Sequence, residues 1–242
     1  MTRTRPPLAA VTFDFWNTLC RADPASMLER RKRAWRDVAV ARNIAVEPEV
    51  LDGVLDVVSG MHHHGWMSNV QFTANDALEH AAELLASVLG PGDSDALETA
   101  WMQASSRSDI QLTPHCVEVL RALQQRGTRI GIVCDVGLTP STILREFLAG
   151  HGVLDAFDHW SFSDEVGVYK PHVAIFEHAL EGLGVNANEA LHIGDIRRTD
   201  IAGARAVGMR PVRYTGVADD DDATTEDAPV VIDDLRLLLA QT

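Results

Sequence analysis

Cysteine is scarce in this chain, which has only Cys20, Cys116 and Cys134 in 242 residues. A small, odd number of cysteines does not make a disulfide framework, so we expect reduced thiols and a cytoplasmic protein. No apolar run approaches the roughly 20 residues that span a bilayer. The segment Met1–Ala10 also has no long apolar stretch of the kind found in secretory signals. We therefore predict that the protein neither enters nor crosses a membrane.

Positive charge is also limited, because the formal net charge is −14. This balance argues against nucleic acid or an anionic membrane surface as a partner, although an anion can still bind where charge is locally positive. Only two of the 21 basic residues are lysines, Lys32 and Lys170. The length and the 46% hydrophobic content suffice for one domain with a sizeable insertion. Nothing in the sequence indicates an oligomeric state.

The first part of the chain predicts one strand followed by a block of helices. Ala10–Phe15 is a short apolar run containing Asp14, typical of a buried parallel strand with a polar residue at its carboxyl end. From Pro24 to about Ser106 the pattern changes to amphipathic helices without a convincing strand. These helices are expected over Met27–Arg42, Pro48–Ser59, Thr73–Leu89 and Asp93–Ser105.

From Thr113 onward, helices and strands alternate. Helices are expected over Pro114–Arg126, Thr139–Ala149, Val173–Leu183, Ile201–Val207 and Asp233–Gln241. Strands are expected over Arg129–Cys134, His159–Phe162, Ala190–Ile193, Arg210–Tyr214 and Val230–Ile232. This alternation predicts an α/β fold with a doubly wound, Rossmann-like parallel sheet and an inserted α-helical cap subdomain. The acidic stretch Asp219–Asp222 is expected to be a solvated loop.

Polar residues follow four of the predicted strands. They are Asp14, Cys134-Asp135, Lys170-Pro171, and Gly194-Asp195 with Asp200. The carboxyl ends of parallel strands meet at one edge of a sheet, so these segments should converge. Three aspartates with hard oxygen ligands favour Mg²⁺, and Lys170 would offset repulsion between a carboxylate and an incoming anion. An aspartate can then act as a nucleophile and form a covalent intermediate.

These residues resemble the motifs of the haloacid dehalogenase superfamily of hydrolases, most of which are phosphatases. Asp14 and Thr18 fit the first motif, Lys170-Pro171 the third, and Gly194-Asp195 with Asp200 the fourth. The resemblance implies that Asp14 is the nucleophile, that Lys170 is catalytic, and that Thr18, Asp135 and Trp16 contact substrate. It implies a Mg²⁺ site made by Asp14, Asp195, Asp200 and the backbone carbonyl of Trp16. It also implies a core domain over residues 1–20 and 108–242, a cap over 21–107, and a small phosphorylated substrate.

Two positions depart from the family pattern. Trp16 replaces the second aspartate of the first motif, which in the family's phosphatases protonates the leaving group and then activates water. Cys134 stands where the second motif normally has a serine or threonine that contacts phosphate, and a thiol is a weaker hydrogen-bond donor. Losing a general acid–base typically costs about 10²–10⁴ in rate.

Several functions are compatible with these departures. The enzyme would act on phosphates with good leaving groups, or the cap would supply another acid. Dehalogenation is a further alternative, because an aromatic residue at the position of Trp16 is typical of that branch; the fourth motif, however, resembles an intact metal site. A phosphonate-cleaving branch would need a cap lysine, and Lys32 lies in a run of basic residues typical of a solvated helix face. A binding protein with little turnover is the last alternative.

The histidine run His62, His63 and His64 is the one feature of the cap with acid–base chemistry near neutral pH. One of these side chains would replace the missing acid if it reached the substrate. The alternative interpretation is a polar turn between helices.

Overall fold

The computed structural model describes residues 8–105 and 110–242. The expected domain boundary at residues 107 and 108, and most of the segment Met1–Ala10, lie outside the described residues. The chain divides into two compact units. One contains Met1–Arg21, Gln111–Asp135 and Leu148–Thr242, and the other contains Ala22–Ile110 and Val136–Phe147. The segment Val136–Phe147, which the sequence placed with the core, therefore groups with the inserted helices.

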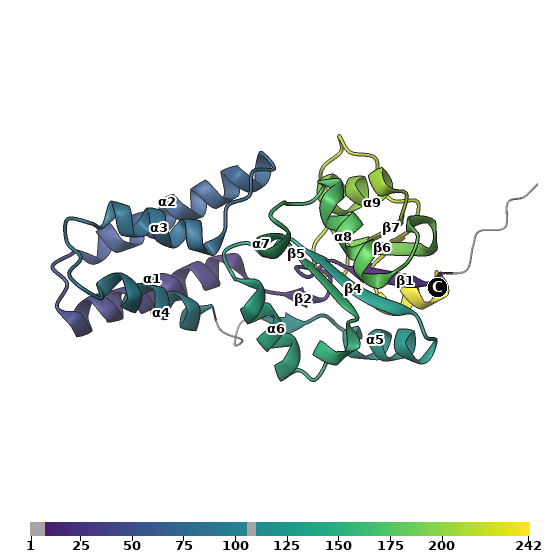
Figure 1. Ribbon diagram of the computed structural model, residues 1–242, viewed down its shortest axis with the longest axis horizontal. Helices are drawn as coiled ribbons and strands as arrows, with labels where there is room; N and C mark the ends of the chain where they lie inside the picture. The colour runs from purple at the N-terminus through teal and green to yellow at the C-terminus, as the bar shows by residue number, and fades with distance from the viewer. Residues whose placement is uncertain (1–7, 106–109) are drawn as a thin grey trace, which may run out of the picture. The chain divides into compact units, whose positions relative to one another are not determined.

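The first unit is built on a six-stranded parallel sheet in the order β5-β4-β1-β6-β7-β8 (Figure 1). The strands are β1 (Ala10–Phe13), β4 (Arg129–Cys134), β5 (His159–Phe162), β6 (Ala190–Gly194), β7 (Arg210–Tyr214) and β8 (Val231–Ile232). β1 lies between β4 and β6 and is buried along its whole length. The predicted α/β class with a doubly wound parallel sheet is confirmed.

Helices cover both faces of this sheet, as crossover connections require. α8 (Val173–Leu183) packs on β4 and β5, and α9 (Ala202–Val207) packs on β7. α5 (Cys116–Gln125) packs on β4 from the other side (Figure 1). The apolar spacing of α8, which buries Ile175, Phe176, Ala179, Leu180 and Leu183, is what directs one face of the helix onto the strands.

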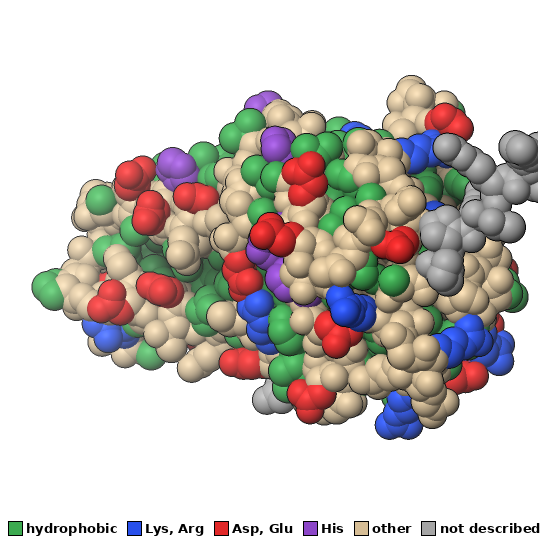
Figure 2. All heavy atoms as spheres, turned by 45° about the vertical axis from the view of Figure 1, so that its right-hand side comes forward, with side chains coloured by type: hydrophobic (Ala, Val, Ile, Leu, Met, Phe, Trp, Pro, Cys, Tyr) green, Lys and Arg blue, Asp and Glu red, His purple; other side chains and the backbone are tan. Residues whose placement is uncertain are grey.

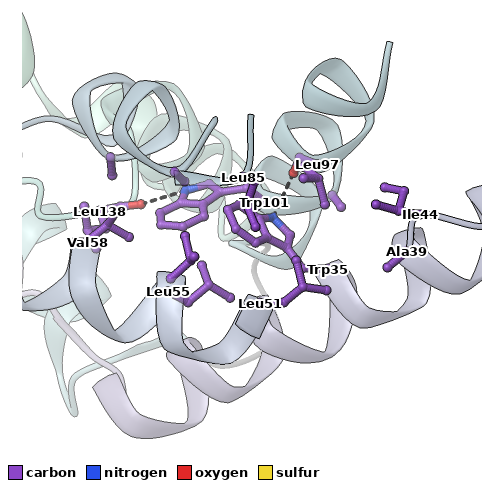
Figure 3. Packing of buried hydrophobic residues seen from close by; sticks show 14 residues of the cluster. Trp35, Ala39, Ile44, Leu51, Leu55, Val58, Leu85, Leu97, Trp101 and Leu138 are labelled. Carbon is purple, nitrogen blue, oxygen red and sulfur yellow. Dashed lines mark hydrogen bonds between the residues drawn. The ribbon is translucent and has the colours of Figure 1, made fainter. Parts of the chain in front are cut away.

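In the second unit, four helices pack around two tryptophans. They are α1 (Pro24–Arg42), α2 (Pro48–Met67), α3 (Ala74–Leu84) and α4 (Asp93–Ala104). Asp23 caps the start of α1, and Thr73 and Asp76 form a capping box at the start of α3. Trp35 and Trp101 are fully buried, and their indole N–H groups donate to the carbonyls of Leu97 and Leu138 at 3.0 and 3.3 Å (Figure 3). Both large side chains are thus buried with their polar atoms satisfied.

Some local expectations differ from the structure. The histidine run lies inside α2, so the inter-helix turn expected there is wrong, and the turn instead begins at Ser68. The helix predicted over Asp233–Gln241 is a short 3₁₀ segment, η5 (Leu235–Ala240). A two-residue antiparallel pair, β2 (Cys20–Arg21) with β3 (Gln111–Leu112), was not predicted. Because these strands are about 90 residues apart in the chain, no local pattern indicates their pairing.

The remaining elements are one ten-residue helix and four shorter segments. They are α6 (Ser141–Gly150), α7 (Ser163–Val166), η2 (Leu154–Ala156), η3 (Ala187–Glu189) and η4 (Arg197–Ile201). Within the described residues, no helix combines the length and apolar character needed to cross a bilayer. Figure 2 shows acidic side chains spread over one face of the molecule, with basic side chains in small separate groups among them. On this face, the negative net charge is thus not offset by a continuous basic surface.

Candidate active site

The site begins where β1 ends. The backbone N–H of Asp14 donates to the carbonyl of Ile193 at 2.8 Å, so Asp14 continues the pairing of β1 with β6. A tight turn follows, in which the N–H groups of Leu19 and Cys20 both donate to the carbonyl of Phe15. Asn17 occupies the left-handed region of this turn, with φ of 57°, which asparagine tolerates better than most residues. The turn thus places successive polar groups at the carboxyl end of the central strand.

Lys170 joins two of the predicted carboxylates. Its ammonium group donates to Oδ1 of Asp14 at 2.5 Å and to Oδ1 of Asp200 at 2.7 Å, and all three side chains are buried. The backbone N–H of Lys170 donates to Oδ1 of Asp135 at 2.9 Å. Asp135, expected to contact substrate, therefore also fixes the segment that presents the lysine.

Asp195 completes a cluster of three carboxylates. One oxygen from each of Asp14, Asp195 and Asp200 lies within 4.8 Å of the others, a spacing at which one ion could contact all three. Oδ2 of Asp195 accepts from the side-chain amide of Asn17 at 3.1 Å. Asn17 was not predicted as a site residue, although it lies inside the first motif. The structure thus brings together four of the five charged residues that the sequence singled out, and the fifth, Asp135, accepts from the backbone of Lys170.

The segment after β6 has an uncommon backbone that directs Asp200 inward. Arg197–Ile201 forms a single π-helical turn, a feature often found at functional sites. Within it, the N–H of Asp200 donates to the carbonyl of Ile196, and the N–H of Ile196 donates to Oδ2 of Asp200 at 3.0 Å. A Cβ atom at Gly194 would overlap the carboxyl carbon of Asp200, so only glycine leaves room for that carboxylate against the strand end.

The pKa directions show that negative charge is in excess at the cluster. Burial opposes ionisation of Asp200, but Lys170 and a hydrogen bond from His192 outweigh it and hold its pKa below the usual range. Burial raises the pKa of Asp14 well above its usual value, and the neighbouring Asp200 and Asp195 add to this effect against the attraction of Lys170. Burial and the charge of Asp200 raise the pKa of Asp195 to about 7.

The ammonium group of Lys170 pairs with two of the three carboxylates, those of Asp14 and Asp200. Burial would lower the pKa of Lys170, but the carboxylates of Asp14 and Asp200 raise it well above normal, so the lysine stays charged. A divalent cation would neutralise the remaining negative charge, and an all-oxygen donor set suits Mg²⁺. The residues present thus fit a hard divalent cation by both charge and ligand type.

The neutral residues predicted at the site are less closely tied to the cluster. Thr18 is fully buried, and its hydroxyl has no hydrogen-bond partner among the described residues. Cys134 is fully buried, and burial together with the charge of Asp14 raises the pKa of its thiol well above normal, so it remains a thiol. Trp16 is half-buried and packs edge-on against Phe15, with ring centroids 4.9 Å apart. None of the three carries a charge that would compete with the carboxylates.

The acidic loop expected to be solvated is held by arginines. Oδ2 of Asp220 accepts from the backbone N–H of Arg197, which begins the π-helical turn. Arg213 makes a two-pronged contact with Asp227 at 2.7 and 2.9 Å and also pairs with Asp219. Asp219 remains largely exposed, so the loop is both solvated and fixed beside the segment that carries Asp195 and Asp200.

The histidines of α2 differ in their surroundings. His62 is half-buried, whereas His63 and His64 are exposed. Burial lowers the pKa of His62 to about 4, and the nearby positive charge of Arg31 contributes. His62 is therefore uncharged at neutral pH, which weighs against it as the acid that replaces Trp16.

Comparison with known proteins places this chain among hydrolases. A family model described as haloacid dehalogenase-like hydrolase matches residues 8–208. A glyceraldehyde 3-phosphate phosphatase from Methanocaldococcus jannaschii is 31% identical over 150 residues, which cover 59% of this chain and 64% of that protein. A ribulose-1,5-bisphosphate 5-phosphatase from Halopiger xanaduensis is 34% identical over 60% of this chain and 59% of its own length. The chain thus spans less than two thirds of the length of these curated relatives.

Solved structures agree on the fold. A haloacid dehalogenase-type phosphatase from Thermococcus onnurineus superposes with a TM-score of 0.67 at 24% identity, covering 97% of both chains. An L-2-haloacid dehalogenase from Xanthobacter autotrophicus superposes with a TM-score of 0.59 at 20% identity, covering 97% of this chain and all of that one. Proteins named as a phosphatase and as a dehalogenase therefore share this fold, so the fold does not distinguish the two activities. The family match over residues 8–208, together with the sheet and the carboxylate cluster, shows that the chain belongs to the haloacid dehalogenase-like hydrolases.

Proposed function

We propose that the protein is a Mg²⁺-dependent phosphatase of small phosphorylated metabolites, in which Asp14 is the nucleophile. The observation that carries this proposal is the buried cluster of Asp14, Asp195 and Asp200 around the single ammonium group of Lys170. The names of the relatives from Methanocaldococcus jannaschii and Halopiger xanaduensis support a phosphate ester as substrate.

The proposed reaction has two steps. A carboxylate oxygen of Asp14 attacks phosphorus, the ester P–O bond breaks, and the alcohol leaves with a proton taken from solvent. Water then hydrolyses the aspartyl phosphate, releasing inorganic phosphate and restoring the carboxylate. Lys170 keeps a positive charge beside Asp14 throughout, which lowers the repulsion between the carboxylate and the phosphate dianion.

The acidic residues would hold the metal ion. Asp14, Asp195 and Asp200, with the backbone carbonyl of Trp16, are the proposed set, and the ion would supply charge neutralisation for the phosphoryl group. The hydroxyl of Thr18 and the thiol of Cys134 would face the phosphate oxygens, with Asp135 holding the Lys170 segment beside them. Because Trp16 cannot protonate the leaving group, the substrate should need a leaving group that is stable as an anion. Aryl and acyl phosphates should therefore react faster than alkyl phosphates.

A phosphate-release assay tests the proposal. The panel contains small sugar phosphates, an acyl phosphate and an aryl phosphate, each with Mg²⁺ or with EDTA. We expect release that requires both Mg²⁺ and Asp14, and its loss in Asp14→Asn. Asp155→Asn is the matched control, because Asp155 is exposed on η2 in the same unit. Equal release from wild type and Asp14→Asn would overturn the assignment of the nucleophile.

A substitution at Trp16 tests the explanation of substrate preference. Trp16→Asp supplies a carboxyl group at the position of the missing acid, and should increase turnover of alkyl phosphates by about 10²-fold or more while changing that of aryl phosphates less. An equal change for both substrates would show that the leaving group does not limit the rate.

Dehalogenation is the second candidate, favoured by the aromatic Trp16 beside the nucleophile. A halide ion leaves without a proton, so that chemistry needs no acid. Halide release from 2-haloacids that is unaffected by EDTA, in the absence of phosphate release, would replace the phosphatase proposal with this one.

A further inference from the structure

His192 is a fully buried polar residue beside the site that the proposed reaction does not use. It lies on β6, and its ring packs edge-on against Phe176 of α8, with centroids 5.1 Å apart and planes at 88°. Gly203 of α9 gives Phe176 the room to pack there, because a Cβ atom at Gly203 would overlap its ring. A polar ring in such surroundings destabilises the fold unless its nitrogens are hydrogen-bonded.

Both ring nitrogens of His192 have partners. Nε2 lies 3.0 Å from Oδ1 of Asp200, and Nδ1 lies 2.9 Å from the hydroxyl of Thr12 on β1. An ionised carboxylate only accepts hydrogen bonds, so Nε2 must carry the hydrogen whatever the charge of the ring. In the neutral ring, Nδ1 then accepts from Thr12. The three side chains form a buried line from the central strand to the carboxylate.

Asp200 receives four hydrogen bonds from the protein. Lys170 and His192 donate to Oδ1, while the N–H of Ile196 and the hydroxyl of Thr199 donate to Oδ2 at 3.0 and 3.3 Å. The orientation of Asp200 is therefore set by the protein before any ion binds. Oδ1 accepts from two side chains, Lys170 and His192. Lys170 also donates to Asp14, whereas the described contacts of His192 include no other carboxylate.

We propose that His192, supported by Thr12, is a positioning residue that holds Asp200 in the orientation required by Lys170 and by the divalent cation. This inference rests on the proposed function, since it assigns a role toward the same metal site. Hydrogen-bonding partners of metal-binding carboxylates typically affect metal affinity or activity by about 10–100-fold. Removing the donor while keeping the shape should therefore weaken cation binding, even though His192 does not touch the ion.

The competing explanation is that His192 only fills space between β6 and α8. Three variants separate the two roles. His192→Leu fills similar volume without a donor, His192→Gln retains an N–H donor on a flexible side chain, and Thr12→Val removes the hydroxyl behind Nδ1 with nearly the same shape. His178→Leu is the matched control, since His178 belongs to the same unit and hydrogen-bonds Ser161 and His159 but no carboxylate.

The measurement is the binding of Mn²⁺, as a spectroscopic substitute for Mg²⁺, to the metal-free protein by titration calorimetry and electron paramagnetic resonance. We expect a Kd about 10–100-fold weaker in His192→Leu, a smaller loss in Thr12→Val, partial recovery in His192→Gln and no change in His178→Leu. Nitrogen NMR of the histidine rings should show hydrogen on Nε2 of His192 in the wild type.

The outcomes distinguish this inference from the proposed function. Wild-type affinity in His192→Leu and Thr12→Val, or an equal loss in the leucine and glutamine variants, would assign His192 to packing and overturn the inference alone. A wild-type protein that binds no Mn²⁺ or Mg²⁺ would overturn the proposed metal site and this inference together.

Discussion

Each of the two compact units buries a basic side chain, and the surroundings of the two differ. In the α/β unit, Lys170 lies between the carboxylates of Asp14 and Asp200. In the helical unit, Arg31 donates to the carbonyl of Leu138 and to the hydroxyls of Thr139 and Ser105. Its guanidinium also lies over the ring of Trp101, 4.6 Å from the centroid, a geometry that favours cation–π attraction.

The pKa directions follow these surroundings. Burial and the charge of Arg30 lower the pKa of Arg31 to about 10, whereas the carboxylates around Lys170 outweigh burial and raise its pKa. Arg31 therefore stabilises the packing of α1, α4 and the segment Val136–Phe147 through neutral acceptors. A buried cation alone does not indicate chemistry; the accumulation of like charges around Lys170 does.

Replacing Lys170 and Arg31 by methionine should give the largest difference in stability between the two units. Lys170→Met leaves buried carboxylates without their partner, which should lower the free energy of unfolding by about 3–5 kcal/mol at neutral pH and reduce turnover by about 10²–10³-fold. Arg31→Met leaves only neutral acceptors unpaired and should cost about 1–3 kcal/mol. Urea unfolding of both metal-free variants measures this, and equal losses would remove the distinction between the two cations.

Gly194 allows a second test in the α/β unit, of how closely Asp200 packs against the end of β6. Gly194→Ala adds a methyl group where Asp200 lies, so the carboxylate must move or the strand end must shift. Overpacking of this kind typically costs about 1–3 kcal/mol. We also expect weaker Mn²⁺ binding, measured by calorimetry. Unchanged stability together with unchanged Mn²⁺ binding would show that the segment after β6 can move to accommodate the methyl group.

The carboxylate cluster should make the free energy of unfolding depend on pH. The pKa of Asp195 is raised to about 7 in the folded protein, against about 3.9 in an unfolded chain. The folded state therefore retains a proton over this interval. The contribution of Asp195 to stability is complete below pH about 4 and is lost as pH rises through about 7, with a slope of at most about 1.4 kcal/mol per pH unit.

Asp195→Asn isolates this contribution. Unfolding of the metal-free wild type and variant between pH 5 and pH 8 should give curves that diverge in slope, with the variant flatter. Asp14, whose pKa is also raised, leaves a residual slope in the variant. Parallel curves would show that Asp195 does not retain a proton in the folded state.

The smallest effect is expected in the helical unit. Gly60 lies inside α2, and a Cβ atom there would meet no atom within 4 Å. Gly60→Ala should therefore raise the free energy of unfolding by about 0.5–1 kcal/mol through helix propensity. Thermal unfolding measures the gain. A loss of stability would mean that this helix position differs from an ordinary exposed one, and would weaken the contrast with Gly194.

Much of the α/β unit could be predicted because its signals are local. Val173–Leu183 matches its predicted bounds because it has one apolar face and ends at a glycine, and the strand Arg210–Tyr214 also matches its predicted bounds. Asp14, Lys170, Asp195 and Asp200 could be expected together because parallel strands end at one edge. The outlines of the site thus follow from strand order and residue type.

The residues that hydrogen-bond to the carboxylates of the site could not be predicted in the same way. His192 is one polar residue in an apolar strand, and only the π-helical turn brings Asp200 to its ring. Asn17 contacts Asp195, which lies 178 positions later in the chain. In α2, the three histidines interrupt the apolar pattern, yet the helix continues to Met67. Contacts that depend on tertiary geometry leave no periodic signal.

The scarcity of lysine gives this protein a chemical reporter of local opening. Apart from the α-amino group, amine-directed acylation can modify only Lys32 and Lys170. The side chain of Lys32 is 15% exposed and that of Lys170 is 3% exposed. Mass spectrometry of a labelling time course would therefore follow two sites, one on the helical unit and one in the carboxylate cluster. The rate at Lys170 would report how often the cluster becomes accessible to solvent, without any engineered probe.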